Sequence, residues 1–171
     1  METQMIADRP SGKPSSAIAT PDIDALFAEQ RRRYRAQPYP PAAQREAQLE
    51  RLERAILRRR DTIERALLAD FRKPPEETAY SEIIVTLAEL RHAKARLAEW
   101  MRPQPVETSL STFGSKAEIR YEPKGVVLVL APWNYPFQLT FAPLIAALAA
   151  GCRAIVRPSE KAPATRDVMA E

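Results

Sequence analysis

The sequence predicts an α/β fold class, in which a layer of helices is followed by the first part of a parallel sheet. Three successive stretches before Pro103 place apolar residues at the helical spacing of three or four. Between Gly125 and Glu171 the pattern changes to strand, helix, strand and helix, which is typical of the start of a β-α-β unit. The chain of 171 residues is 45% hydrophobic and can therefore bury a core. Because too few strands follow for a complete sheet, the pattern predicts a truncated one.

Changes in composition, and prolines and glycines at the boundaries, divide the chain into four predicted segments. Residues 1–20 carry no apolar run and are predicted to be a disordered extension. Residues 21–103 form the helical segment, and residues 104–124 form a bridging strand segment. Residues 125–171 begin a sheet domain that is incomplete within this sequence.

Prolines and capping residues mark the predicted helices. Thr20-Pro21-Asp22 is a helix-start signal, and the first helix is expected to end before Pro38. A second helix is expected over residues 41–71, with its leucines and isoleucines along one stripe. A third is expected over residues 78–101, closed by Pro103.

After Pro103 the spacing of the apolar residues is that of β-strands. Residues 117–121 alternate between apolar and charged side chains, which predicts a half-exposed strand. Residues 126–130 are five consecutive apolar residues, which predicts a strand covered on both faces. The pattern then predicts a turn at 131–136, an apolar helix at 137–150 ended by Gly151, a strand at 153–157 and a helix from Pro163.

Rare residue types exclude several kinds of site. One cysteine and one histidine exclude an intrachain disulfide, Cys-x-x-Cys sites and two-histidine metal sites, so no metal is expected. The four glycines are too far apart for the common glycine-rich phosphate loops. The net charge of +4 is too small to indicate a nucleic-acid partner, and the arginine triplets at 31–33 and 58–60 are interpreted as solvated helix faces. The longest mostly apolar stretch, residues 139–150, is too short to span a membrane, so the expected setting is cytoplasmic.

The most informative string is the turn Pro132-Trp133-Asn134-Tyr135-Pro136. It places a polar amide at the carboxyl end of an apolar strand, the edge where open α/β sheets bind ligands. The turn resembles the Pro-Trp-Asn-(Phe/Tyr)-Pro turn of the aldehyde dehydrogenase superfamily. The resemblance covers about residues 22–171 of this sequence. It includes Ala149-Ala150-Gly151 and Arg157-Pro158-Ser159-Glu160, and three further strings are similar to the class 3 branch of fatty-aldehyde and coniferyl-aldehyde dehydrogenases: Lys73-Pro74-Pro75, Ser81-Glu82-Ile83 and Trp100-Met101-Arg102-Pro103.

The resemblance implies roles for six residues. Asn134 would be catalytic, because the family's asparagine amide donates to the thiohemiacetal oxygen that forms when a cysteine attacks the aldehyde. The cofactor-binding residues would be Pro132, Trp133, Arg157, Ser159 and Glu160. Of these, Arg157 and Glu160 stand where the family has the lysine and glutamate that hold the adenosine ribose, with arginine replacing lysine here.

The resemblance also implies what surrounds these residues. Residues 125–171 would begin a Rossmann-like NAD(P)-binding domain, with NAD or NADP as cofactor and an aldehyde as substrate. Residues 104–124 would be an oligomerisation segment of a homodimer. The family's nucleophile and general base would lie outside residues 1–171, so this chain alone is expected to be inactive.

Other interpretations remain open from the sequence alone. Asn134 also suits a turn in which its side chain bonds its own backbone, and Glu160 suits a helix cap or a surface carboxylate. Cys152 lies between a helix-ending glycine and a strand and is interpreted as a small core residue. His92 is interpreted as structural or surface. For the whole chain, the alternative is a helical interaction or nucleic-acid-binding module without enzymatic activity.

Overall fold

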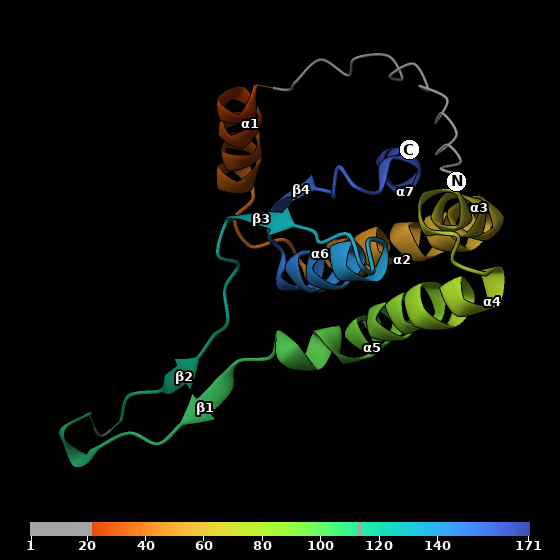
Figure 1. Ribbon diagram of the computed structural model, residues 1–171. Coiled ribbons are helices and arrows are strands. Elements are labelled where there is room, and N and C mark those ends of the chain that lie inside the picture. The colour runs from red at the N-terminus through yellow and green to blue at the C-terminus, as the bar shows by residue number, and fades with distance from the viewer. Residues whose placement is uncertain (1–21, 113) are drawn as a thin grey trace, which may run out of the picture.

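The computed structural model describes residues 22–112 and 114–171, and its mixture of helices with two small sheets confirms the α/β class (Figure 1). The predicted extension at residues 1–20, with Thr20 and Pro21 of the helix-start signal, lies outside the described residues. The helices are α1 (Ile23–Ala36), α2 (Ala42–Arg58), α3 (Arg60–Phe71), α4 (Pro75–Thr78), the π-helical η1 (Ala79–Ile84), α5 (Val85–Trp100), α6 (Gln138–Ala150) and α7 (Pro163–Ala170). The strands are β1 (Gln104–Val106), β2 (Ala117–Ile119), β3 (Val126–Leu130) and β4 (Arg153–Arg157), and a 3₁₀ turn covers Leu110–Thr112.

The first helix begins at Ile23 with Asp22 as its N-cap, whereas the start signal predicts Asp22 to lie within the first turn. The Asp22 carboxylate accepts hydrogen bonds from the backbone N–H groups of Asp24 and Ala25, and so caps α1. The helix contacts β3 and β4. On this side the Tyr34 hydroxyl donates to the Pro123 carbonyl over 3.0 Å, which ties α1 to the chain just before β3.

The prediction of one continuous helix over residues 41–71 is wrong, because the chain breaks at Arg59. The Arg59 backbone has φ −104° and ψ 10°, outside helical geometry, and separates α2 from α3. The break divides the packing: α2 lies against α5 and α6, whereas α3 lies against α7.

The third predicted helix begins three residues early and is not a regular α-helix throughout. Pro75 occupies the first helical position of α4, where proline costs no hydrogen bond. The chain then passes through η1 into α5 without leaving helical geometry. A π-helical insertion of this kind is often found at functional sites.

One hydrophobic core joins the helical layer to α6. The predicted apolar stripes of the second and third helices are confirmed by the burial of their leucines and isoleucines, and α6 completes this core (Figure 1). The predicted stripe of the first helix is wrong as a core face, because α1 has no buried residue and Ile23 is 67% exposed. The buried residues of the cluster are Leu49, Ile56, Ile63, Leu67, Ile83, Leu87, Leu90, Ala93, Leu97, Phe137, Phe141, Ile145 and Ala149.

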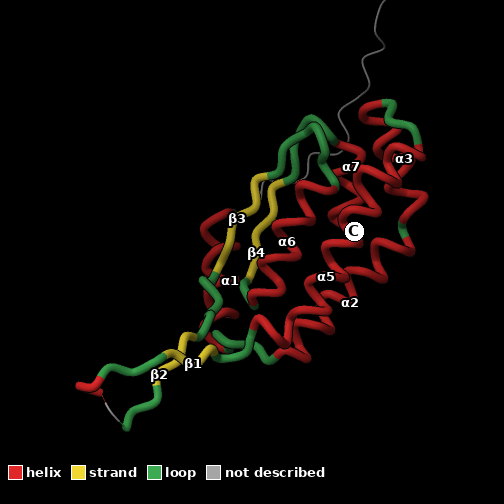
Figure 2. Tube along the Cα trace, turned by 90° about the horizontal axis from the view of Figure 1, so that it is seen from below, coloured by secondary structure: helices red, strands yellow, loops and turns green. Residues whose placement is uncertain are grey.

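The bridging segment folds as a hairpin that projects from the body of the molecule (Figures 1 and 2). β1 pairs antiparallel with β2, with Pro105 opposite Glu118. The strand predicted over residues 117–121 covers only Ala117–Ile119, and it pairs with β1, a strand that the sequence did not indicate. The prediction of a half-exposed strand is also wrong, because every residue of β1 and β2 is exposed.

The strand, helix, strand and helix after Gly125 are confirmed. β3 and β4 pair in parallel, with Val126 opposite Arg153 and Leu130 opposite Arg157, and α6 connects them. Gly151 ends α6 with a left-handed φ of 83°, the conformation that favours glycine. Within residues 22–112 and 114–171 no helix is both long enough and apolar enough to cross a membrane.

The prediction that β3 is covered on both faces is wrong in this structure. Val129 is buried, but Leu128 and Leu130 are 60% and 65% exposed. Neighbouring residues of a strand point to opposite faces, so one face of β3 packs on the helical core and the other is open. The five-residue apolar run does not alternate because both of its faces are apolar.

Candidate functional site

The candidate site lies where the two parallel strands end. Because Leu130 is paired with Arg157, the turn after β3 and the loop after β4 leave the sheet side by side (Figure 2). A hydrogen bond of 3.0 Å from the Ala131 N–H to the Arg157 carbonyl extends the pairing into the turn. The sheet thereby places the two strings containing the predicted site residues, 132–134 and 157–160, at one edge. In α/β sheets, ligands bind at the carboxyl ends of the strands.

Asn134 stands at the exposed tip of the first turn. Among the described residues, none forms a hydrogen bond with its side chain, so the amide lacks the backbone contact that a purely turn-forming asparagine would make. Its two neighbours are held. The Trp133 ring lies 6.3 Å from the Phe71 ring, and the Tyr135 ring lies 4.4 Å from the Lys73 ammonium. The turn therefore presents a free amide between two anchored aromatic rings.

The loop after β4 carries the other predicted site residues. Arg157 and Glu160 form an exposed ion pair of 2.9 Å. The Glu160 backbone N–H and the Arg157 guanidinium hold the pKa of the Glu160 carboxyl below its usual value, so this carboxylate is ionised at neutral pH. Ser159 is buried, and its hydroxyl accepts a hydrogen bond of 3.2 Å from the Lys161 N–H. Ser159 thus shapes the loop, while Arg157 and Glu160 face solvent.

The interpretation of Glu160 as a helix cap is wrong. The N-cap position of α7 is Ala162, which has no capping side chain. Asp70 of α3 accepts instead from the backbone N–H groups of Ala164 and Thr165, at 3.0 and 2.7 Å, and from the Thr165 hydroxyl at 2.7 Å. The Glu160 carboxylate is therefore not used in ending or starting a helix.

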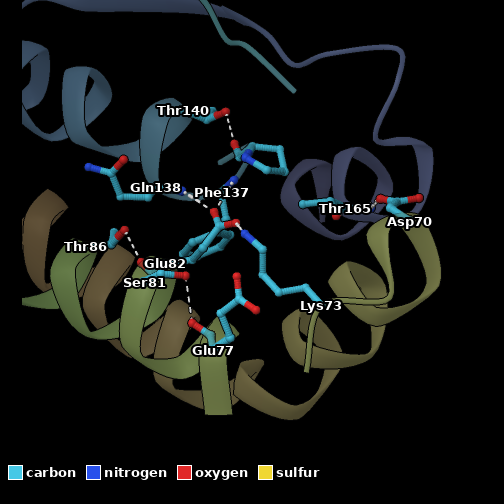
Figure 3. Close-up of polar contacts among 11 residues, drawn as sticks. Asp70, Lys73, Glu77, Ser81, Glu82, Thr86, Phe137, Gln138, Thr140 and Thr165 are labelled. Carbon is cyan, nitrogen blue, oxygen red and sulfur yellow. Dashed lines mark hydrogen bonds and ion pairs between the residues drawn. The ribbon is translucent and has the colours of Figure 1, made fainter. Parts of the chain in front are cut away.

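Two charged residues behind the turn were not singled out as site residues from the sequence. Lys73 and Glu82 are both buried, and they form an ion pair of 2.5 Å directly beneath the start of α6 (Figure 3). A sequence signal for Glu82 does exist. It lies four residues before Thr86 and eight before Leu90, on the buried stripe of the helix, where a carboxylate requires a partner.

The remaining candidates lie away from this edge. Cys152 is 7% exposed just before β4, at the opposite end of the sheet from Asn134, which confirms its interpretation as a small buried residue. His92 is exposed, with its ring 5.6 Å from that of Trp100. Residues 31–33 are exposed, as expected for a solvated helix face. In the second triplet Arg58 and Arg60 are exposed, and the half-buried Arg59 pairs with Glu171.

Comparison with known proteins finds one family and relatives that belong to it. Residues 8–171 match the aldehyde dehydrogenase family. A probable coniferyl aldehyde dehydrogenase of Caulobacter vibrioides is 40% identical over 135 residues, which are 76% of this chain and 28% of that protein. Aldehyde dehydrogenase family 3 member B1 of Bos taurus is 40% identical over 131 residues, 77% of this chain and 28% of that protein.

A solved structure supports the same relationship. The structure described as the substrate-bound state of Staphylococcus aureus AldH superimposes with a TM-score of 0.84 at 37% identity. The match covers 88% of this chain and 33% of that one. This chain thus spans about a third or less of the length of the relatives that it matches.

Proposed function

The chain belongs to the aldehyde dehydrogenase family, and from this premise we propose that it is the amino-terminal part of an NAD(P)-dependent enzyme that oxidises an aldehyde to the carboxylic acid. The observation that carries the proposal is the free amide of Asn134 at the carboxyl edge of β3. The names of relatives from Caulobacter vibrioides and Pseudomonas aeruginosa, 40% and 39% identical, support an aromatic aldehyde such as coniferyl aldehyde. A fatty aldehyde is the other candidate within the class 3 resemblance.

The proposed role of Asn134 follows from its geometry. When a thiol attacks an aldehyde, the carbonyl oxygen becomes negative, and a neutral N–H donor already in place stabilises that charge without moving. The Asn134 amide has such donors, it is exposed, and its neighbours Trp133 and Tyr135 are anchored. In comparable oxyanion holes one donor contributes about 3 kcal/mol.

The residues at this edge also fit a dinucleotide. Pro132 and Trp133 present an exposed, flat, apolar surface after β3, and Arg157 with Glu160 presents a guanidinium and an ionised carboxylate after β4. A carboxylate accepts from ribose hydroxyls, and a guanidinium donates to hydroxyls or phosphate. We propose that these residues hold NAD or NADP, with Ser159 fixing the loop from beneath. When bound, the nicotinamide supplies a hydride acceptor.

The surroundings of the site complete the proposal. The projecting β1–β2 hairpin suits the expected role of residues 104–124 in a homodimer, because its exposed strand edges can pair with another chain. A cytoplasmic setting is part of the same proposal. The alternative of a nucleic-acid module has little support, since Arg32 and Arg33 pair with Glu29, and Arg60 pairs with Glu64.

The deciding experiment removes the Asn134 donors in the enzyme that contains this chain. Asn134→Ala is expected to lower kcat by about 10²- to 10³-fold, with the dissociation constant for NAD nearly unchanged, because the lost interaction is strongest in the transition state. Asn134→Asp keeps the shape but replaces the donors with a negative charge beside the oxyanion, and should be at least as slow. Residues 1–171 alone serve as a blank, with no aldehyde-dependent NADH expected.

Two outcomes would contradict this proposal. One is a folded Asn134→Ala enzyme with near-normal kcat, which would show that the Asn134 amide serves only to shape the turn. The other is aldehyde-dependent NADH formation by residues 1–171 alone, which would show that the chain is a complete catalyst and not the amino-terminal part of one.

A further inference from the structure

We infer that Glu82 is a positioning residue for the turn that carries Asn134, acting together with Lys73; this inference rests on the proposed role of Asn134. Glu82 lies in η1 and has no exposed surface, and Lys73 is only 9% exposed. Charged side chains are almost never buried this deeply unless they are paired. Their place in the fold therefore requires an explanation from their contacts.

The Glu82 carboxylate uses both of its oxygens. Its Oε2 accepts from the backbone N–H groups of Phe137 and Gln138, at 2.9 and 3.0 Å, and its Oε1 accepts from the Lys73 ammonium (Figure 3). The two N–H groups belong to the N-cap residue and the first residue of α6, a helix that has no capping side chain of its own. A residue of the helical layer thus caps the helix that follows the Asn134 turn, where negative charge is favoured.

Lys73 extends this contact toward Asn134. Its ammonium bonds Glu82 and also lies 4.4 Å from the centroid of the Tyr135 ring, the residue next to Asn134. A buried cation over an aromatic face is attracted to it. Glu82 therefore fixes the backbone after the turn directly, and fixes the Tyr135 side chain through Lys73.

The turn is held at its other end by the sheet. The Ala131 N–H bonds the Arg157 carbonyl, and beyond the turn the Thr140 hydroxyl donates to the Pro136 carbonyl. Asn134 lies between these two anchors without a bond of its own to the described residues. Since small displacements of a catalytic donor are costly in rate, the anchors decide where the amide points.

A glutamine in place of Glu82 separates charge from shape. Its carbonyl oxygen can still accept from Phe137 and Gln138, but its NH₂ group then faces the Lys73 ammonium, donor against donor. The lysine loses its counter-ion and moves from the Tyr135 ring. Lys73→Met combined with Glu82→Gln removes both charges, so that neither is left buried and unpaired.

The first test needs no catalysis. In the enzyme that contains this chain, Glu82→Gln should raise the hydrogen-exchange rate of the Phe137 and Gln138 amides about tenfold, because a bond to a carboxylate is replaced by a weaker one to a neutral amide. Glu77→Gln is the matched control, since Glu77 is exposed and lies one and a half turns earlier on the same helical stretch. Unchanged exchange in Glu82→Gln would overturn the inference.

The second test asks whether Glu82 acts through Asn134 in the enzyme that contains this chain. Glu82→Gln, and Lys73→Met with Glu82→Gln if the single variant does not fold, should lower kcat about tenfold with KM for NAD(P) within about twofold. Adding Glu82→Gln to Asn134→Ala should cause no further loss, because the amide being positioned is already gone. If the losses in kcat of the two single variants multiply in the double variant, the positioning role is overturned. Normal turnover of Glu82→Gln beside a slow Asn134→Ala would overturn it as well. Normal turnover of Asn134→Ala would instead overturn the proposed function.

Discussion

Gly151 shows how one residue can be fixed by both its backbone and its neighbour. Its φ of +83° belongs to the left-handed region, and a Cβ placed there would lie 2.6 Å from Cζ of Arg45. Arg45 is itself held, because its guanidinium donates to the carbonyls of Pro40 and Ala149 at 2.8 and 3.0 Å. The end of α6 and the start of α2 are therefore joined through a space that only glycine leaves free.

Gly151→Ala is expected to lower the free energy of unfolding by about 2 kcal/mol or more, since left-handed strain adds to displacement of a buried guanidinium. Cys152→Ala, one residue along, is the matched control. It leaves a small cavity in a buried but unstrained position and should cost about 1 kcal/mol or less. Urea denaturation of both variants checks the difference. Equal stabilities would show that Arg45 moves aside without cost.

At the scale of elements, Asp70 holds α7 in the absence of a local cap. Asp70→Ala should lower the free energy of unfolding by about 1–2 kcal/mol and speed hydrogen exchange at Ala164 and Thr165, the two amides that it accepts from. Asp61→Ala, at an exposed position in the first turn of α3, should change stability by only a few tenths of a kcal/mol. Unaltered exchange at both amides would mean that α7 is held by packing on α3 alone.

The helices and the β-α-β unit could be predicted because their signals are local. Apolar spacing, Pro75, Pro103 and Gly151 all lie within the elements that they define or beside them. The break at Arg59 carries no such signal, since neither proline nor glycine marks it. The β1–β2 pairing was missed because β1 is three residues long and contains Pro105.

In the candidate site, too, local features could be predicted from the sequence and distant contacts could not. Asn134 and the residues at 157–160 lie in short strings that can be read along the chain, directly after strands. The contacts that hold them are distant in sequence: Glu82 bonds amides 55 and 56 residues away, and Asp70 bonds amides 94 and 95 residues away. Such contacts depend on how the helical layer docks on α6 and α7, which no single stretch encodes.

At the scale of the molecule, the helical part buries its apolar side chains more completely than the sheet does. The helical layer is amphipathic and is closed by α6, but the sheet has two strands and, although α1 contacts both of them, one apolar face of β3 is open. Leu128 and Leu130 stand on that face, and Trp133 in the turn and Leu110 on the hairpin are also exposed, at 51% and 93%. Contiguous apolar surface beside unpaired strand edges favours association.

Residues 1–171 alone are therefore expected to self-associate and to be poorly soluble. Leu128→Lys combined with Leu130→Lys places two charges on the open face of β3 without touching the helical core, and should shift the chain toward monomer in sedimentation velocity. Leu57→Lys with Leu68→Lys is the matched control, because these leucines are 48% and 45% exposed on α2 and α3, away from the sheet. If the open face drives association, only the β3 pair restores monomer. A monodisperse unsubstituted chain, or equal rescue by both pairs, would show that the face of β3 is not what associates.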